Sequence, residues 1–154
     1  MAKKPASKGM KLRTGKRKPD RPLPICNAFL ICEKIIFDTI ATAPTLIGLF
    51  SEFGIVSLPS YLSPFWLFIQ AADGVIGEYK VEIEIQDLDR GETVHRFKAK
   101  PLIFDTRPEV YNSMIAVPPM RIDYPSGVYA VVVFADGKMF AQQKFTVRIA
   151  ENPS

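Results

Sequence analysis

Few residues of this chain have the type and spacing that catalysis requires. His95 is its single histidine, and no G-x-S-x-G motif accompanies it. A serine or cysteine nucleophile needs an imidazole within hydrogen-bonding reach and a third group that orients the ring. We therefore interpret His95 as a structural or exposed residue of a strand, and the sequence predicts no catalytic residue.

Metal ligands are equally sparse. Zinc sites usually take four ligands from short-spaced pairs, and Cys26 and Cys32 are the only two cysteines. If both lie in one strand, they share a face about 20 Å apart, too far for a disulfide, and we interpret them as small buried residues. The segment 87–92, DLDRGE, is similar to the start of a calcium loop, but Gly91 stands where an oxygen ligand is required and Glu92 where glycine is required. We expect a hairpin turn there, and we expect no metal and no cofactor.

Two clusters are candidates for a partner surface. Asp105, Arg107 and Glu109 alternate beside Pro108, so they can project together from a sheet edge toward a polar ligand or a partner. The alternative is that these charges protect an edge strand from pairing with other chains. Trp66 lies in the aromatic segment 61–68, where an exposed tryptophan would be an interface anchor. The alternative is that Trp66 is the core tryptophan of the fold.

Charge is distributed unevenly along the chain. Residues 1–22 carry nine Lys/Arg and one acid, a net charge of +8. Because the whole chain has a net charge of +4, the remaining residues have a net charge of −4. The segment 1–23 has almost nothing apolar to bury, and we predict a disordered basic tail. The residues that could contact phosphates of nucleic acid or anionic lipid are Lys3, Lys4, Lys8, Lys11, Arg13, Lys16, Arg17, Lys18 and Arg21. The alternative is a solubilising extension.

Residues 24–150 predict one β domain, followed by a short C-terminal tail, 151–154. Apolar runs of strand length occur at 25–37, 45–53, 64–72, 78–88, 93–99, 110–117, 128–135 and 138–149. In 78–88, apolar residues from Tyr79 to Ile85 alternate with polar ones, which places one face in a core and one in water. The run 128–135 is apolar on both faces and predicts a central strand, and Asp136-Gly137 favours a type I′ turn after it.

Two further patterns bear on location and fold. The uncharged segment 53–72 is long enough to cross a bilayer, but Pro59 and Pro64 interrupt it, so we predict a loop and a buried strand over 65–70. A secretory signal fits poorly, because Glu33 and Lys34 interrupt the apolar stretch after the basic region, and we expect a cytoplasmic protein. Tyr129 follows Gly127 in the order of a tyrosine corner, whose hydroxyl bonds back to the upstream chain; the alternative is an ordinary strand tyrosine.

These strands predict an all-β protein, an immunoglobulin-like antiparallel β-sandwich of about seven to eight strands. The order FLICEKIIFDT, TLIGLFSEF, GEYKVEIEIQDLDRGE and PSGVYAVVVFADGKMFAQQKFTVRI resembles a family of small bacterial proteins known only as a domain of unknown function. Its members look like single sandwiches with a Cys-acidic strand, here Cys32 and Glu33, a Leu-Ile-Gly strand, here Leu46 to Phe50, and a terminal G-x-Y hairpin. The resemblance covers residues 28–149, and it implies the fold and brings no catalytic residues.

Three functional hypotheses follow. The first is a non-enzymatic binding or scaffolding module that contacts a protein partner by an edge strand or by loops. The second is a nucleic-acid-associated protein that binds phosphates through its basic tail. The third is an enzyme with an unfamiliar carboxylate site at Asp105 and Glu109.

Overall fold

The chain folds into strands joined by turns and short connections. The computed structural model describes residues 20–40, 43–106, 110–124 and 126–150. Within these ranges the strands are β1 (Ile25–Asp38), β2 (Ala43–Leu49), β3 (Glu52–Ile55), β4 (Ser60–Leu62), β5 (Phe65–Ala72), β6 (Gly77–Asp87), β7 (Glu92–Phe104), β8 (Val110–Val117), β9 (Met120–Ile122), β10 (Ser126–Ala135) and β11 (Lys138–Ile149). The long strands match the apolar runs of the sequence.

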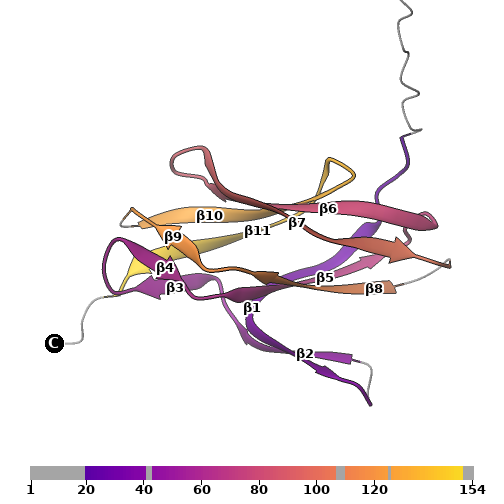
Figure 1. Cartoon of the computed structure of the whole chain (residues 1–154), viewed down its shortest axis with the longest axis horizontal. Coiled ribbons are helices and arrows are strands. Elements are labelled where there is room, and N and C mark those ends of the chain that lie inside the picture. The colour runs from indigo at the N-terminus through magenta and orange to yellow at the C-terminus, as the bar shows by residue number, and fades with distance from the viewer. Residues whose placement is uncertain (1–19, 41–42, 107–109, 125, 151–154) are drawn as a thin grey trace, which may run out of the picture.

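Two sheets face each other across the core (Figure 1). Sheet A has the strand order β2-β1-β5-β8, and sheet B has the order β3-β11-β10-β6-β7. The two short strands β4 and β9 pair only with each other. Neighbouring strands are antiparallel, except that β3 runs parallel to β11. The all-β class and the immunoglobulin-like sandwich predicted from the sequence are confirmed.

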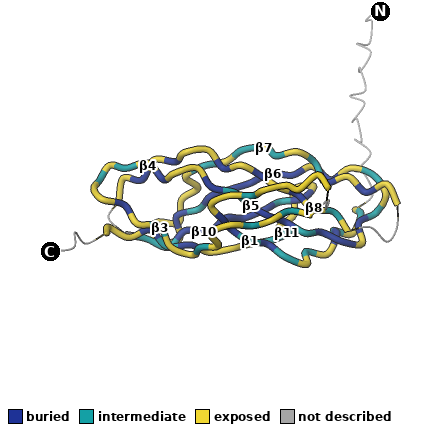
Figure 2. Tube along the Cα trace, turned by 90° about the horizontal axis from the view of Figure 1, so that it is seen from below, coloured by how far each residue is buried: buried dark blue, intermediate teal, exposed yellow. Residues whose placement is uncertain are grey.

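The core consists of the side chains that alternate inward from both sheets. Figure 2 shows buried positions alternating with exposed ones along the strands. In β6 the inward residues from Tyr79 to Ile85 are almost fully buried, as their spacing predicts. Aromatic rings fill one end, where Phe53 lies 5.2 Å from both Phe65 and Phe145 between ring centroids. Each fully buried side chain of this size contributes about 1.5–3 kcal/mol to stability.

The structure differs from the sequence prediction in four places. The run 45–53 forms two strands, β2 and β3, because the chain leaves sheet A near Phe50 and joins sheet B beside β11. Strand β7 continues to Phe104, five residues past the predicted end. The three-residue strands β4 and β9 were not predicted, since they form where two loops meet across the fold. The parallel pairing of β3 was also missed, because parallel neighbours leave no hairpin signal in sequence.

Side-chain contacts fix the segment that leads into the first strand. Residues 20–23, which the sequence assigns to the tail, contact the domain. The guanidinium of Arg21 lies 3.8 Å from the centroid of the Tyr79 ring, and its Nε donates to Asp136 Oδ2 at 2.9 Å. Asp136 Oδ1 accepts from the backbone N–H of Lys80 at 2.9 Å. Asp136 and Gly137 have φ of 50° and 80°, as the predicted type I′ turn requires.

The uncharged segment 53–72 holds β3, β4 and β5. The predicted buried strand after Pro64 is therefore confirmed. In the part of the chain that the structure describes, no helix is long and apolar enough to cross a membrane.

Candidate functional surfaces

The outer face of sheet A carries a row of apolar side chains. Alternation along β1 and β5 sends Ile31, Leu67 and Ile69 into the core and leaves their neighbours pointing outward. Cross-strand register then aligns the outward residues, with Leu30 opposite Phe68 and Phe68 opposite Met114. Trp66 lies between Cys32 and Ala116 in the same way. We call these outward residues the apolar face: Leu30, Cys32, Trp66, Phe68, Met114 and Ala116.

The two cysteines lie on different faces of β1. The register of β1 against β5 shifts between Cys26 and Ala28, which indicates a β-bulge, and a bulge changes which side chains point to which face. Cys26 consequently packs against the core between the sheets, whereas Cys32 belongs to the apolar face. The expectation that both share one face is therefore wrong. Both thiols are free, and burial raises the pKa of each.

The outer face of sheet B is of opposite character. Arg96 forms ion pairs with Glu82, at 3.4 Å, and with Glu84, and Gln86 donates to Glu84 at 2.9 Å. A hollow of about 620 Å³ lies over this side, lined by residues that include Lys80, Lys98, Phe134 and Asp136. This face is the charged, water-facing side that a sandwich normally presents.

Sheet A continues beyond the body as a two-stranded arm. We define the arm as residues 33–40 of β1 and its turn together with β2, which is hydrogen-bonded only to β1. In Figure 1 β2 and the adjoining part of β1 extend below the rest of the sandwich. Every strand residue of the arm is partly or fully exposed. The large apolar residues are among them, with exposed fractions of 43% for Ile36, 93% for Ile40 and 60% for Leu49.

The Cys-acidic and Leu-Ile-Gly segments of the sequence face each other where the arm leaves the body. Lys34 pairs with Ile47, and Cys32 pairs with Leu49, so Glu33 and Gly48 lie opposite each other between these pairs. Gly48 has a φ of +68°, and a Cβ placed on it would lie 2.9 Å from the Glu33 side chain. Position 48 therefore favours glycine for its backbone conformation, whereas the exposed Glu33 side chain could move aside. The Cys-acidic and Leu-Ile-Gly motifs are two halves of one hairpin.

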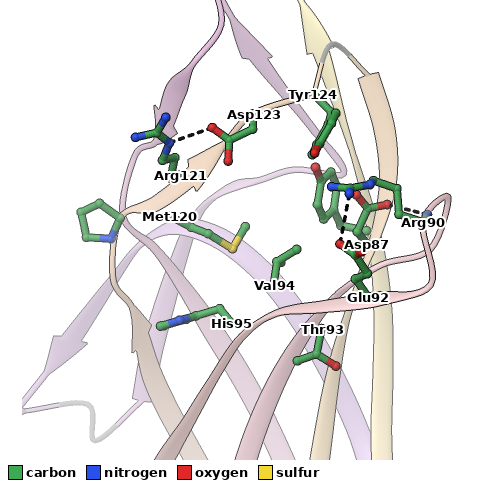
Figure 3. Close-up of a pocket in the computed structure, with 12 residues that line it drawn as sticks. Asp87, Arg90, Glu92, Thr93, Val94, His95, Met120, Arg121, Asp123 and Tyr124 are labelled. Carbon is green, nitrogen blue, oxygen red and sulfur yellow. Dashed lines mark hydrogen bonds and ion pairs between the residues drawn. The ribbon is translucent and has the colours of Figure 1, made fainter.

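A pocket of about 510 Å³ lies at one end of the sandwich, between the β6–β7 turn and β9 (Figure 3). Asp87 Oδ1 accepts from the backbone N–H groups of Asp89, at 3.0 Å, and Arg90, at 3.1 Å. These bonds build the hairpin turn expected at 87–92. Arg90 lies 3.7 Å from the centroid of the Tyr124 ring. Arg121 forms an ion pair with Asp123 at 2.7 Å.

The pocket's charged groups are thus engaged with each other or with the backbone. His95 Nε2 is enclosed and has no hydrogen-bond partner among the residues that the structure describes. Its ring lies 5.4 Å from that of Phe97, on the inward side of β7. Across the described ranges, no group of three His, Cys, Asp or Glu residues is arranged to hold a metal ion. The pocket therefore has the contacts of a structural turn.

Tyr129 lines this pocket and does not form the tyrosine corner suggested by the sequence. Its ring stacks on Phe145 at 5.4 Å and 10°, and its hydroxyl has no hydrogen bond to any described residue. Burial, and then the negative charge of Asp87, raises the pKa of Tyr129. Tyr79 makes the bond instead, because its hydroxyl donates to Pro22 O at 2.9 Å.

The structure separates the residues that the sequence offered as a partner surface. Trp66 is partly buried on the apolar face and is absent from the core between the sheets. Asp105 is exposed and follows the end of β7, and Arg107 and Glu109 lie outside the described residues. Trp66 lies in β5 of sheet A, whereas Asp105 follows β7 at the edge of sheet B, so these two residues belong to different sheets.

Sequence reasoning missed most of the apolar face and all of the arm's exposed residues. One signal was available: apart from Gln70, residues 65–72 are apolar on both faces of a strand, as in a strand covered on both sides. Residues 39–51 also contain no charge, which is unusual for a sheet edge.

Comparison with known proteins concerns the fold. No family model matches the chain, and no curated protein matches it. The alkylpurine DNA glycosylase AlkC of Pseudomonas fluorescens, solved on DNA with an abasic site analogue, shares 14% identity over 78% of this chain, with a TM-score of 0.45. The chain spans 30% of that glycosylase. An immunoglobulin-like protein of Pseudomonas aeruginosa shares 14% identity over 85% of this chain and 100% of its own, with a TM-score of 0.44. The chain's own fold agrees with its resemblance to an uncharacterised family of small immunoglobulin-like sandwiches.

Proposed function

We propose that this protein is a non-enzymatic binding module that holds a protein partner on the apolar face of sheet A. The supporting observation is the contrast between the two outer faces. Sheet B presents paired charges to water, whereas the outward residues of β5 and β8 in sheet A contain no charged group within the described residues. Leu30, Trp66 and Met114 keep part of their apolar surface exposed on this face, and an exposed apolar patch is a feature of interaction surfaces.

Trp66 is the expected anchor of this contact beside Phe68. Trp66 is aromatic and partly exposed, and such residues dominate the binding energy at the centre of interfaces, whereas Phe68 is only 7% exposed and can bury little further area on binding. Leu30 and Met114 flank them on the neighbouring strands. The partner is expected to offer an apolar, weakly charged surface, because a charged group placed here would lose hydration without gaining a partner.

A matched pair of methionine variants tests the proposal. Met114 lies on the apolar face and is 36% exposed, while Met139 is the second residue of β11 in sheet B and is 59% exposed. The full-length protein is used as bait in a host lysate, with nuclease treatment and high-salt washing, and retained proteins are quantified by mass spectrometry. Met114→Glu is expected to reduce the specifically retained protein about tenfold or more, and Met139→Glu is expected to leave it unchanged. Equal retention by both variants would contradict the proposal.

The charge asymmetry of the chain favours a second candidate, polyanion binding by the tail. Eight of its nine candidate cations, Lys3 to Lys18, lie outside the described residues, and Arg21 is engaged with Asp136 and Tyr79. Binding of this kind depends steeply on salt and little on sequence. The same lysate experiment separates it, because material held by the tail is expected to be lost on nuclease treatment and in high salt.

A further inference from the structure

The arm has an apolar side that continues the apolar face away from the body. Alternation along the two strands places Ile36, Ile47 and Leu49 on this side, together with Lys34 and Asp38. An isolated two-stranded hairpin is marginally stable in water. An arm that exposes this much apolar surface without any covering layer is therefore expected to be stabilised by a partner.

We propose that the arm is a dimerisation element that packs face to face, about a twofold axis at Ile36, with the arm of a second copy of this chain. The proposal rests on the proposed function, since both use the outward side of sheet A. It identifies the partner of the arm as a second copy of the same protein. Two observations on the arm favour a second copy: its charge pattern and its area.

The charge pattern is self-complementary. Lys34 and Asp38 lie two residues on either side of Ile36, so each is about 7 Å from it along the strand. A twofold axis at Ile36 runs the two β1 strands antiparallel, which brings Lys34 of one copy opposite Asp38 of the second copy, twice. Lys34 forms no ion pair with any residue that the structure describes. Asp38 Oδ1 accepts from the backbone N–H of Ile40 at 2.8 Å, and a carboxylate can accept further bonds.

The exposed area is that of a small interface. The exposed fractions of Ile36, Ile47 and Leu49 are 43%, 42% and 60%, which correspond to roughly 250 Å² per copy, taking about 180 Å² for a fully exposed large apolar side chain. Two copies bury about twice that area, and the exposed side chains of Lys34, Asp38 and Thr45 add to it. The contact therefore belongs to the small, weakly associating class of specific interfaces.

No other exposed strand combines these properties. Strand β7 carries Arg96, Lys98 and Lys100 outward, so twofold packing of its outer side would bring cations together. Strand β8 is uncharged but contacts β7 beside the body of the sandwich, and strand β3 is only four residues long.

The test exchanges the two charges in the full-length protein and measures mass by sedimentation velocity over a micromolar concentration series. The wild type is expected to be dimeric at the upper end. Lys34→Glu and Asp38→Lys are each expected to weaken the dimer about tenfold or more, because each puts like charges opposite each other. An equimolar mixture of the two variants is expected to restore dimers, since every facing pair then has opposite charges. Thermal unfolding of each variant checks that the domain stays folded.

Three results would overturn the proposal: a wild type that stays monomeric throughout, a dimer that neither variant weakens, or a mixture in which dimers do not return. The restored mixture cannot arise from unfolded variants, so a folding defect is not mistaken for support. Failure here is separable from failure of the proposed function, because the methionine variants of the body report on the partner of the apolar face and leave Lys34 and Asp38 intact.

Discussion

Two buried tyrosines of the core are expected to respond very differently to loss of their hydroxyl group. The Tyr79 hydroxyl donates to Pro22 O and accepts from the backbone N–H of Val75, both at 2.9 Å. The Tyr129 hydroxyl has no hydrogen bond to any described residue. Both rings are almost fully buried, so Tyr→Phe at each position removes one oxygen atom and keeps the packing.

The size of the difference follows from the groups left behind. In Tyr79→Phe, a carbonyl and an N–H lose a partner in a partly buried environment, and each such loss costs about 1–3 kcal/mol when water cannot replace the bond. Because water can reach these groups in part, we expect a total loss of about 2 kcal/mol. The phenyl ring still accepts the stacking of Arg21, so the substitution isolates the hydroxyl. Tyr129→Phe is expected to change the free energy of unfolding by less than about 0.5 kcal/mol.

Urea unfolding followed by circular dichroism measures both free energies, and an unchanged slope against urea shows that the unfolded states are comparable. In thermal unfolding, the Tyr79→Phe loss corresponds to a fall in Tm of about 4–8 °C for a domain of this length. Tyr129→Phe is the matched control. A loss for Tyr129→Phe equal to or larger than that for Tyr79→Phe would refute the assignment of the hydrogen-bonded tyrosine.

Three further predictions concern the core and the cysteines. The pKa of Tyr129 is raised in the folded state, so the tyrosine of the unfolded chain ionises at a lower pH. The free energy of unfolding is therefore expected to fall as pH rises above about 10. Urea titrations between about pH 9 and pH 11 measure this fall, which is expected to be smaller in Tyr129→Phe. Phe145→Ala removes a ring that contacts Phe53, Phe65 and Tyr129. It is expected to lower the free energy of unfolding by about 3–5 kcal/mol in urea titrations. A loss below about 1 kcal/mol would show that the ring is not closely packed in the core. Cys26 is partly exposed and Cys32 is buried, so mass spectrometry after alkylation is expected to show Cys26 modified first, and equal rates would contradict the burial of Cys32.

Short sequence patterns predicted the features that depend on neighbouring residues, namely side-chain direction along a strand and turn geometry. Period-two alternation in 78–88 fixed the inward face of β6, and Asp136-Gly137 fixed the last hairpin, because side-chain direction and turn geometry depend on neighbouring residues in the chain. The tyrosine corner failed for the opposite reason. Its hydrogen bond depends on where the upstream chain passes, and residues 20–23 pass over Tyr79.

The apolar face likewise could not be predicted from the sequence of one strand. Strands β5 and β10 both have apolar residues on two faces, so their sequences alone do not show which one has an uncovered face. In β10, the outward Ala130 and Val132 are buried because Glu84, Gln86, Gln142 and Lys144 stand beside them in register. In β5, the register brings Leu30, Cys32 and Met114 beside Trp66 and Phe68. Cys32 and Phe68 are buried among these neighbours, whereas Met114 is exposed and Leu30 and Trp66 are partly exposed, so the side chains that cover this face are apolar and not charged.

The sequence by itself therefore determined the strand class, most strand positions and the charge asymmetry between tail and domain. Only the tertiary structure decided that Trp66 faces outward, that the two cysteines occupy opposite faces of β1, and that residues 33–40 and 43–49 project as an arm. Each of these depends on strand register, on the bulge near Cys26 and on which strands become neighbours. Those are contacts between segments far apart in the chain, and the pattern of any one segment does not specify them.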